Sequence, residues 1–353
     1  MRVAAVRTVL PEHRYEQHEI TEAVAARTDA DPRVLARFHA NTQITGRHLA
    51  LPIEEYDRLT DFTAANDAYV DRALDLGERA AAAALDAAGL DPSDIDHLLF
   101  CSSTGLAVPS LDAELAQRAG LREDVVRVPV FGLGCAAGAA GLARVNDHLR
   151  GRPDGAALLV CVELCSLTVQ RDDVTAPNLV GSGLFGDGAA AAVALGDDRT
   201  AGRPADGTAG PRIVASRSRL YPGTRRLMGW RVGAHGFRIV LAADLVDLVD
   251  KELAGDVDAF LRDHGLSRAD VPSWVCHPGG PKVIEKIGEV LGLDGGELDV
   301  TWESLRRAGN LSSVSVLNVL EQTIAERRPG AGVPGVLMAL GPGFSAELVL
   351  LRW

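Results

Sequence analysis

The chain repeats one pattern of helix, linker and strand after about half of its length. The segment ALDAAGLDPSDIDHLLFCSSTG, which starts at Ala84, resembles FLRDHGLSRADVPSWVCHPGG, which starts at Phe260. In this comparison Cys101 lies opposite His277, at an offset of 277 − 101 = 176 residues. Each copy predicts a helix that ends at a glycine, a short acidic linker and a buried apolar strand.

Two further pairs of segments occur in the same order and at similar offsets. VVRVPVFGLGCAAGAAGLARVNDHL and WESLRRAGNLSSVSVLNVLEQTI each lead through a glycine turn into a helix, and they place Cys135 opposite Asn310, 310 − 135 = 175 residues apart. LFGDGAAAAVAL, from Leu184, and LGPGFSAELVLL, from Leu340, each join a Gly-rich turn to an apolar strand. Gly-Leu helix ends are common enough for one chance match, but three matches in one order favour a duplication.

A duplicated chain of strands and helices predicts an α/β fold in which two related halves pack in layers about a pseudo-two-fold axis. We expect the N-terminal half at residues 1–200 and the C-terminal half at residues 210–353. The stretch 196–212, GDDRTAGRPADGTAGPR, predicts a surface connection between them, because it is rich in Gly, Pro, Asp and Arg. The length of 353 residues agrees, since domains have about 150 residues each.

Composition limits the class of protein. Hydrophobic residues make up 47% and charged residues 24% of the chain, a balance typical of a folded globular protein. Lys and Arg number 36 against 48 Asp and Glu, so the net charge of 36 − 48 = −12 argues against a nucleic acid partner. No apolar run approaches the ~20 residues of a membrane span and no signal peptide is evident, so we expect a cytoplasmic protein. Five cysteines, an odd number, predict reduced thiols, and their spacing predicts no metal site.

Cys135 stands where a predicted strand turns into a predicted helix, between Gly132-Leu-Gly134 and Ala-Ala-Gly-Ala-Ala-Gly. A thiol at the start of a helix faces unpaired backbone N–H groups, which favour the thiolate and lower its pKa from about 8.5. The same N–H groups could bind the oxyanion of a thioester. A buried cysteine is more often a small hydrophobic residue, but the glycine turn favours a nucleophile here.

His277 and Asn310 occupy repeat positions related to this turn. His277 follows the apolar strand Ser-Trp-Val-Cys and precedes Pro-Gly-Gly-Pro, which ends the strand and leaves the imidazole at a loop. A lone histidine is usually structural, but the place of His277 in the repeat favours a catalytic role. Asn310, in Gly-Asn-Leu-Ser-Ser, fits a helix N-cap as well as a catalytic amide.

These motifs together resemble the type III polyketide synthases, the chalcone synthase-like family. Cys135, His277 and Asn310 stand in Gly-Cys-Ala-Ala-Gly, His-Pro-Gly-Gly-Pro and Gly-Asn-Leu-Ser-Ser, and LFGDG and LGPG match two further family motifs. The resemblance covers nearly the whole chain in order and spacing. It implies a thiolase-like fold with αβαβα layers, a homodimer, and chemistry on CoA thioesters without a metal or a bound cofactor.

The resemblance also implies a mechanism. Cys135 would take an acyl group from a starter thioester, and His277 and Asn310 would polarise the carbonyl of a malonyl thioester. Loss of CO₂ then leaves an enolate that these two donors stabilise while it attacks the acyl-cysteine.

Further site residues are implied by the same alignment. Phe185 and Phe237 match the two phenylalanines that gate the crevice between the CoA tunnel and the cyclisation cavity. Arg47, Gly279 and Gly280 would bind CoA, Arg47 through its phosphates. The residues assigned to the cavity are Ser103, Cys165, Met228, Trp230, Ser312, Gly341, Pro342 and Gly343. Val108 matches a residue that reaches into the partner's cavity in related dimers.

The segment from Leu227 to Phe237, LMGWRVGAHGF, is similar to bacterial alkylresorcinol and alkylpyrone synthases. That similarity implies a fatty acyl starter, delivered by CoA or an acyl carrier protein, and extension by malonyl-CoA or methylmalonyl-CoA. Dihydroxyphenylacetyl-CoA synthases are an alternative. Tetrahydroxynaphthalene synthases are another, although they carry a cysteine where this chain has Ser103.

Proteins of other classes remain open as alternatives. A ketoacyl-ACP synthase III shares the fold and the triad, but its histidine stands in a different motif. A cysteine peptidase uses Cys, His and Asn in this order, yet the aromatic residue that follows the papain-type cysteine is absent. A non-catalytic acyl-CoA-binding protein on the same fold would release no CO₂ from malonyl-CoA.

Overall fold

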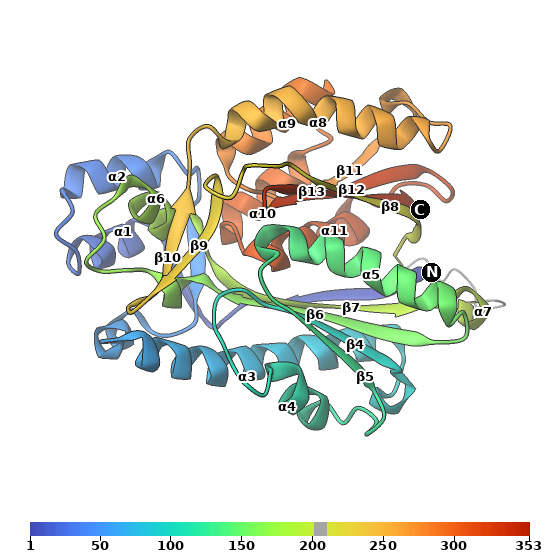
Figure 1. Ribbon diagram of the computed structural model, residues 1–353, viewed down its shortest axis with the longest axis horizontal. Coiled ribbons are helices and arrows are strands. Elements are labelled where there is room, and N and C mark those ends of the chain that lie inside the picture. Colours follow the sequence, from blue (N-terminus) through green and yellow to red (C-terminus); the bar gives the residue numbers. More distant parts are fainter. Residues whose placement is uncertain (201–209) are drawn as a thin grey trace.

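The computed structural model describes residues 1–200 and 210–353 (Figure 1). Most of the predicted connection at 196–212 therefore lies outside the described residues. The strands form one sheet of nine with the order β11-β12-β13-β8-β1-β7-β6-β4-β5, and two small hairpins accompany it. The sheet joins two parts through a single residue pair between β1 and β8, Arg2 with Arg212.

The two parts of the sheet have the same pattern of strand directions. In the N-terminal part β4 runs parallel to β6, which is antiparallel to β7, which is antiparallel to β1. In the C-terminal part β11 runs parallel to β12, which is antiparallel to β13, which is antiparallel to β8. β5 extends the N-terminal part as a parallel edge strand. The bounds are β1 Arg2–Val9, β4 His97–Cys101, β5 Val126–Val130, β6 Ala156–Leu164, β7 Asp187–Leu195, β8 Arg212–Leu220, β11 Ser273–Cys276, β12 Pro334–Gly341 and β13 Ser345–Arg352.

Helices cover both parts and separate them. α5 and α11 lie between the two parts of the sheet, α3 and α4 cover the outer face of one part, and α8 and α9 cover the outer face of the other (Figure 1). The layers therefore follow the order αβαβα, which confirms the predicted fold class. The bounds are α3 Phe62–Ala88, α4 Leu111–Arg118, α5 Ala137–Gly151, α8 Leu245–Arg262, α9 Pro281–Leu291, α10 Asp299–Ala308 and α11 Ser315–Glu326.

Shorter elements gather at one end of the layers, on the left in Figure 1. Of these, β2 pairs with β3 and β9 pairs with β10 in antiparallel hairpins. The bounds are β2 His13–Glu16, β3 Gly46–Leu49, α1 Gln17–Ala25, α2 Pro32–Ala40, α6 Ala176–Leu184, β9 Met228–Gly233 and β10 Gly236–Leu241; α7, Asp197–Thr200, lies at the other end. The 3₁₀ turns are η1 Ile53–Arg58, η2 Pro92–Asp94, η3 Gly134–Ala136, η4 Cys165–Thr168, η5 Arg268–Asp270 and η6 Ser312–Val314.

The duplicated segments occupy equivalent places. β4 ends at Cys101, and β11 ends at Cys276, directly before His277. The turn η3 leads into α5 as η6 leads into α11. The strands and helices predicted from these repeats are therefore confirmed.

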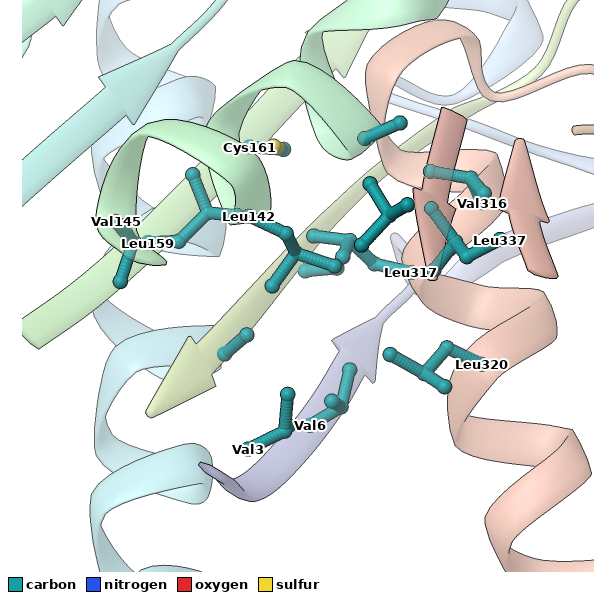
Figure 2. Close-up of a cluster of buried hydrophobic side chains, with 14 of the residues drawn as sticks. Val3, Val6, Leu142, Val145, Leu159, Cys161, Val316, Leu317, Leu320 and Leu337 are labelled. Carbon is teal, nitrogen blue, oxygen red and sulfur yellow. The ribbon is translucent and has the colours of Figure 1, made fainter. Parts of the chain in front are cut away.

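One apolar cluster joins the two halves through α5 and α11 (Figure 2). Leu142 of α5 and Leu317 of α11 are both fully buried in it, together with Val6 of β1, Leu159 of β6 and Leu337 of β12. Because side chains from both parts of the sheet enter the same cluster, the halves share one core and fix each other's orientation.

Small residues in α5 allow the two central helices to approach closely. A Cβ atom at Gly138 would lie 2.3 Å from the carbonyl oxygen of Ser313 and 2.7 Å from a methyl carbon of Val316. At Gly141 it would lie 2.7 Å from a methyl carbon of Leu159. The run of glycine and alanine after Cys135 thus sets the distance between the turn that carries Cys135 and the turn that follows Asn310.

All five cysteines are free and buried, as reduced thiols require. Within residues 1–200 and 210–353, no three His, Cys, Asp or Glu side chains are grouped so that they could hold a metal ion. In the same ranges no helix has both the length and the apolar character needed to cross a bilayer.

The close approach at Gly138 predicts that Gly138→Ala destabilises the protein. The added methyl group would force α5 away from α11, at a cost of roughly 1–3 kcal/mol in the free energy of unfolding, measured by urea denaturation. Gly255→Ala is the matched control, because Gly255 lies within α8 and a Cβ there would meet nothing within 4 Å. The control should gain about 1 kcal/mol from helix propensity, and a stable Gly138→Ala would contradict the argument.

Candidate active site

Cys135 lies in a turn that only glycine neighbours permit. Gly134 has φ +47°, and a Cβ there would lie 2.9 Å from the ring of Pro342. A Cβ at Gly341 would lie 2.6 Å from the backbone nitrogen of Ala136. The motif with Gly341 and Pro342 therefore packs directly against the cysteine turn and holds it in place.

The structure brings Asn310 to Cys135. The Sγ atom of Cys135 lies 3.9 Å from Oδ1 and 4.0 Å from Nδ2 of Asn310, and 3.8 Å from Oγ of Ser312. The backbone N–H of Ser312 donates to Oδ1 of Asn310 at 2.8 Å, which fixes the orientation of the amide and of its NH₂ donor. Asn310 is only 1% exposed, so these contacts lie inside the protein.

His277 is buried at the end of β11, and its imidazole has no protein partner. Its backbone N–H donates to the carbonyl of Met338 at 2.9 Å, continuing the pairing of β11 with β12. Among the residues that the structure describes, neither ring nitrogen has a hydrogen-bond partner. Buried polar atoms are rarely left unpaired, so this imidazole is available to a ligand oxygen.

The His277 loop is connected to Asn310 by hydrogen bonds. The N–H of Gly279 donates to the carbonyl of His277 at 2.9 Å, and Nδ2 of Asn310 donates to the carbonyl of Gly279 at 3.3 Å. Cys135, Asn310 and the loop of His277 therefore form one connected group from both halves of the chain.

Burial keeps both titratable groups of this site neutral. It raises the pKa of Cys135 to about 12, against opposing effects of hydrogen bonds with Ser312, Asn310 and its own backbone. It lowers the pKa of His277 to about 3. The predicted lowering of the Cys135 pKa is thus wrong for the ligand-free protein, because desolvation of the sulfur outweighs the donors around it.

Glu163, which the sequence analysis missed, lies beside the cysteine. It is fully buried and accepts hydrogen bonds from the hydroxyl groups of Ser313 at 2.7 Å, Thr104 at 3.0 Å, Ser103 at 3.1 Å and Ser312 at 3.3 Å. Burial raises its pKa, and the hydrogen bonds from Ser313, Ser103 and Thr104 lower it. Ser312 thus touches both Glu163 and Cys135. A carboxylate in the otherwise apolar strand AALLVCVEL was the signal that could have revealed it.

A cavity of about 400 Å³ lies next to this group, between α1, η1, the start of α3, η4, α6 and β10. Predicted site residues that line it are Phe185, Phe237, Cys165 and Arg47, and Thr104 lines it as well. Cys135 and His277 are not among its lining residues. His277 lines a second cavity of about 40 Å³, which it shares with Met228 and Gly279.

The two predicted gate residues lie on the wall of the larger cavity. Phe185 follows α6 and forms an isolated β-bridge with Asn310. Phe237 is 2% exposed, and its ring centroid lies 5.6 Å from that of Phe62 and 5.8 Å from that of Trp230. Phe185 thus contacts the group of Cys135 and Asn310 through its backbone bridge, whereas Phe237 packs among other aromatic rings of the cavity wall.

The remaining predicted cavity residues line neither of these two cavities: Ser103, Trp230, Ser312, Gly341, Pro342 and Gly343. Gly280 precedes α9 with φ 144°. Val108 is fully exposed.

The structure argues against the predicted CoA-phosphate role of Arg47. The residue is 2% exposed, and its guanidinium donates to the side chain of Gln17 and to the carbonyls of Ser182 and Phe185. Its donors are thus bound to protein acceptors, and it meets the wall of the larger cavity and not the outer surface of the protein.

Ser312→Ala should raise the pKa of Cys135, because the Ser312 hydroxyl favours the charged sulfur. We expect alkylation of Cys135 by iodoacetamide at pH 8 to become about three- to ten-fold slower, measured by mass spectrometry of the labelled peptide. Ser315→Ala is the control, since that hydroxyl accepts from the N–H of Leu311 and, among the described residues, no hydrogen bond joins it to the sulfur. Equal rates in the two variants would contradict the role of Ser312.

Both halves of the chain match known families. Residues 1–199 match the N-terminal domain, and residues 212–353 the C-terminal domain, of chalcone and stilbene synthases. A 1,3,6,8-tetrahydroxynaphthalene synthase of Streptomyces peucetius subsp. caesius is 54% identical over 99% of this chain and 93% of its own length. A putative chalcone synthase of Bacillus subtilis is 34% identical over 99% of this chain and 98% of its own length.

A solved structure agrees with these matches. The crystal structure of 1,3,6,8-tetrahydroxynaphthalene synthase from Streptomyces coelicolor A3(2), a bacterial type III polyketide synthase, covers 100% of this chain and 99% of that chain, with a TM-score of 0.92 and 31% identity. The likeness extends over both layered halves, as expected of the thiolase-like fold. The chain belongs to the chalcone and stilbene synthase family and is a type III polyketide synthase.

Proposed function

We propose that this synthase makes 1,3,6,8-tetrahydroxynaphthalene from malonyl-CoA alone. The observation that carries the proposal is the 54% identity, over 99% of the chain, to a synthase of that name. The proposal replaces the alkylresorcinol or alkylpyrone product and the fatty acyl starter that the segment from Leu227 to Phe237 predicted. A local similarity over one hairpin carries less weight than identity along the whole chain.

Tetrahydroxynaphthalene synthases carry a cysteine where this chain has Ser103, but the surroundings of Ser103 weaken this objection to a naphthalene product. The side chain is 3% exposed, and its hydroxyl and backbone N–H both donate to Glu163. It therefore supports the carboxylate beside Cys135 and lines neither cavity. A serine here is compatible with a naphthalene product.

The atoms of five malonyl-CoA account for all products of the proposed reaction. The naphthalene ring has ten carbons, and each malonyl unit contributes two after it loses one CO₂. Five malonyl-CoA therefore give one tetrahydroxynaphthalene, five CO₂, five CoA and one water. No oxidant, reductant or metal is required.

The site residues have complementary roles in this proposal. The Cys135 thiol would pass its proton to the neutral His277 imidazole as the sulfur attacks the starter thioester, and the CoA sulfur would take that proton as it leaves, so that His277 is neutral again. The imidazole and the Nδ2 group of Asn310 would then donate to the thioester oxygen of each extender, where negative charge develops on loss of CO₂. A neutral, water-poor site favours the decarboxylation, because it strengthens these hydrogen bonds to the enolate.

The larger cavity supports the proposal as the place where the chain grows. Its volume of about 400 Å³ lies in the range of ligand pockets. Apolar side chains such as Leu49, Ile53 and Leu167 line it beside the polar Thr104 and Thr168. Such a wall suits a flat chain that carries oxygen at alternate carbons.

The purified enzyme incubated with labelled malonyl-CoA should release CO₂ and form tetrahydroxynaphthalene, identified by mass spectrometry. Parallel reactions that also contain acyl-CoA starters of graded length should not form product faster than the reaction with malonyl-CoA alone. A product that forms only when a fatty acyl-CoA is added would overturn the proposal and restore the alkylresorcinol or alkylpyrone alternative. Dihydroxyphenylacetyl-CoA as the product would support the other alternative.

Two variants serve as controls for this assay. Cys135→Ala should abolish the product and leave malonyl-CoA decarboxylation measurable, because the decarboxylating donors remain. His277→Ala should suppress both activities. Product from Cys135→Ala would refute the role of the thiol.

The proposal includes a homodimer formed at the edge strand β5. Exposed apolar side chains gather on this strand and the loops beside it: Leu106, Val108, Val126, Val128 and Phe131, of which Val108 is 101% and Phe131 53% exposed. The Phe131 ring also lies 6.4 Å from that of Phe237, at the wall of the cavity. A second copy of the chain would cover this patch and close the open edge.

Val128→Glu should therefore convert a dimer to a monomer, because a charge at a buried interface is costly. The molar mass in solution, from light scattering after size exclusion, measures the change. Val214→Glu is the control, since Val214 has the same exposure of 38% on β8. A wild-type monomer at micromolar concentration would be inconsistent with the dimer.

A further inference from the structure

Arg47 is a buried cation whose acceptors are neutral. Its hydrogen bonds go to Oε1 of Gln17 at 3.1 Å, to the carbonyl of Ser182 at 2.7 Å and to the carbonyl of Phe185. Among the described residues, no carboxylate forms an ion pair with it. Burial lowers the pKa of Arg47 to about 10, and the charge of Asp187, which forms no ion pair with it, raises the pKa.

The end of helix α6 supplies hydrogen-bond acceptors for the guanidinium. The last carbonyls of a helix lack partners within the helix and carry its partial negative charge. Arg47 binds the carbonyls of Ser182 and Phe185, and Nε2 of Gln17 donates to the carbonyl of Gly183 at 2.8 Å. Arg47 and Gln17, which also bind each other, thus cap the end of α6 as one unit.

The segment at the end of α6 is also hydrogen-bonded to the backbone of Asn310. The N–H of Asn310 donates to the carbonyl of Leu184 at 2.9 Å, and the N–H of Gly186 donates to the carbonyl of Asn310 at 2.9 Å. Arg47 also lies against the residue before Asn310, because a Cβ at Gly309 would be 2.9 Å from the Cδ atom of Arg47. Each carbonyl from Ser182 to Phe185 is therefore bound by Arg47, Gln17 or Asn310.

We infer that Arg47, together with Gln17, is a positioning residue for Asn310. By capping α6, the guanidinium fixes the short bridge between Phe185 and Asn310, and that bridge aims the Asn310 amide at the thioester oxygen. The inference rests on the proposed role of Asn310 in decarboxylation. Arg47 itself does not touch the reacting atoms; it acts through the backbone.

The test is a double-mutant cycle on malonyl-CoA decarboxylation, which does not depend on the identity of the product. Arg47→Ala should lower kcat about 10-fold or more, with a smaller change in KM, because a misplaced donor weakens transition-state binding. In an Asn310→Ala background the same change should have little further effect on kcat, since the donor that Arg47 positions is gone. If the fold-loss of kcat in the double variant equals the product of the losses in the two single variants, the inference is overturned.

Chemical rescue adds a second measurement. Arg47 lines the larger cavity, so guanidinium ion can reach the space that Arg47→Ala leaves. Millimolar guanidinium chloride should restore part of kcat to Arg47→Ala and none to Asn310→Ala, whereas sodium chloride should restore neither. If Arg47→Ala does not fold, Gln17→Ala takes its place in the cycle, because it removes one cap and one bond of the guanidinium.

Arg268→Ala is the matched control for a purely structural effect. Arg268 caps the end of another helix, α9, through the carbonyl of Val290 at 2.8 Å, and pairs with Asp258. Its loss should lower the melting temperature and leave kcat unchanged. An equal fall of kcat in Arg268→Ala would assign the Arg47 effect to general destabilisation. Full decarboxylation by Asn310→Ala would instead refute both this inference and the proposed role of Asn310.

Discussion

The close contact between α5 and α11 is the constraint on which the rest of the structure depends. It brings the start of one central helix, where Cys135 lies, against the start of the other, which follows Asn310. The contact exists because Gly138 has no side chain where a Cβ would meet the Ser313 carbonyl. The apolar cluster around this contact holds both parts of the sheet in a fixed orientation. The packing of α5 against α11 therefore shapes both the core and the site (Figure 2).

Burial gives the site its chemical character. The same packing that fixes the residues removes water from them, so the thiol and the imidazole are neutral without a ligand. The unpaired imidazole of His277 has one N–H donor in its neutral form, and this N–H and the amide of Asn310 are in place before substrate arrives. Preorganised donors of this kind stabilise developing negative charge at little reorganisation cost, as decarboxylation and condensation both require.

Polar groups buried around the site have a different task. Glu163 accepts hydrogen bonds from the hydroxyl groups beside Cys135, and Arg47 donates hydrogen bonds to carbonyls at the end of α6. Each is satisfied by several partners from distant parts of the chain, which is how ionisable groups persist in a core. Glu163 bonds to residues beside Cys135 and Asn310, and Arg47 bonds to the segment that pairs with Asn310.

The sequence by itself determined the layered fold, the equivalence of the two halves, and the candidates Cys135, His277 and Asn310, because these depend on local turns, apolar periodicity and a repeat. Only the tertiary structure decided the pKa of Cys135, the burial of Arg47 and the place of Glu163. The physical reason is that desolvation and hydrogen bonding depend on which distant segments surround a group. A helix start predicted a lowered pKa, and the atoms packed over the sulfur reversed it.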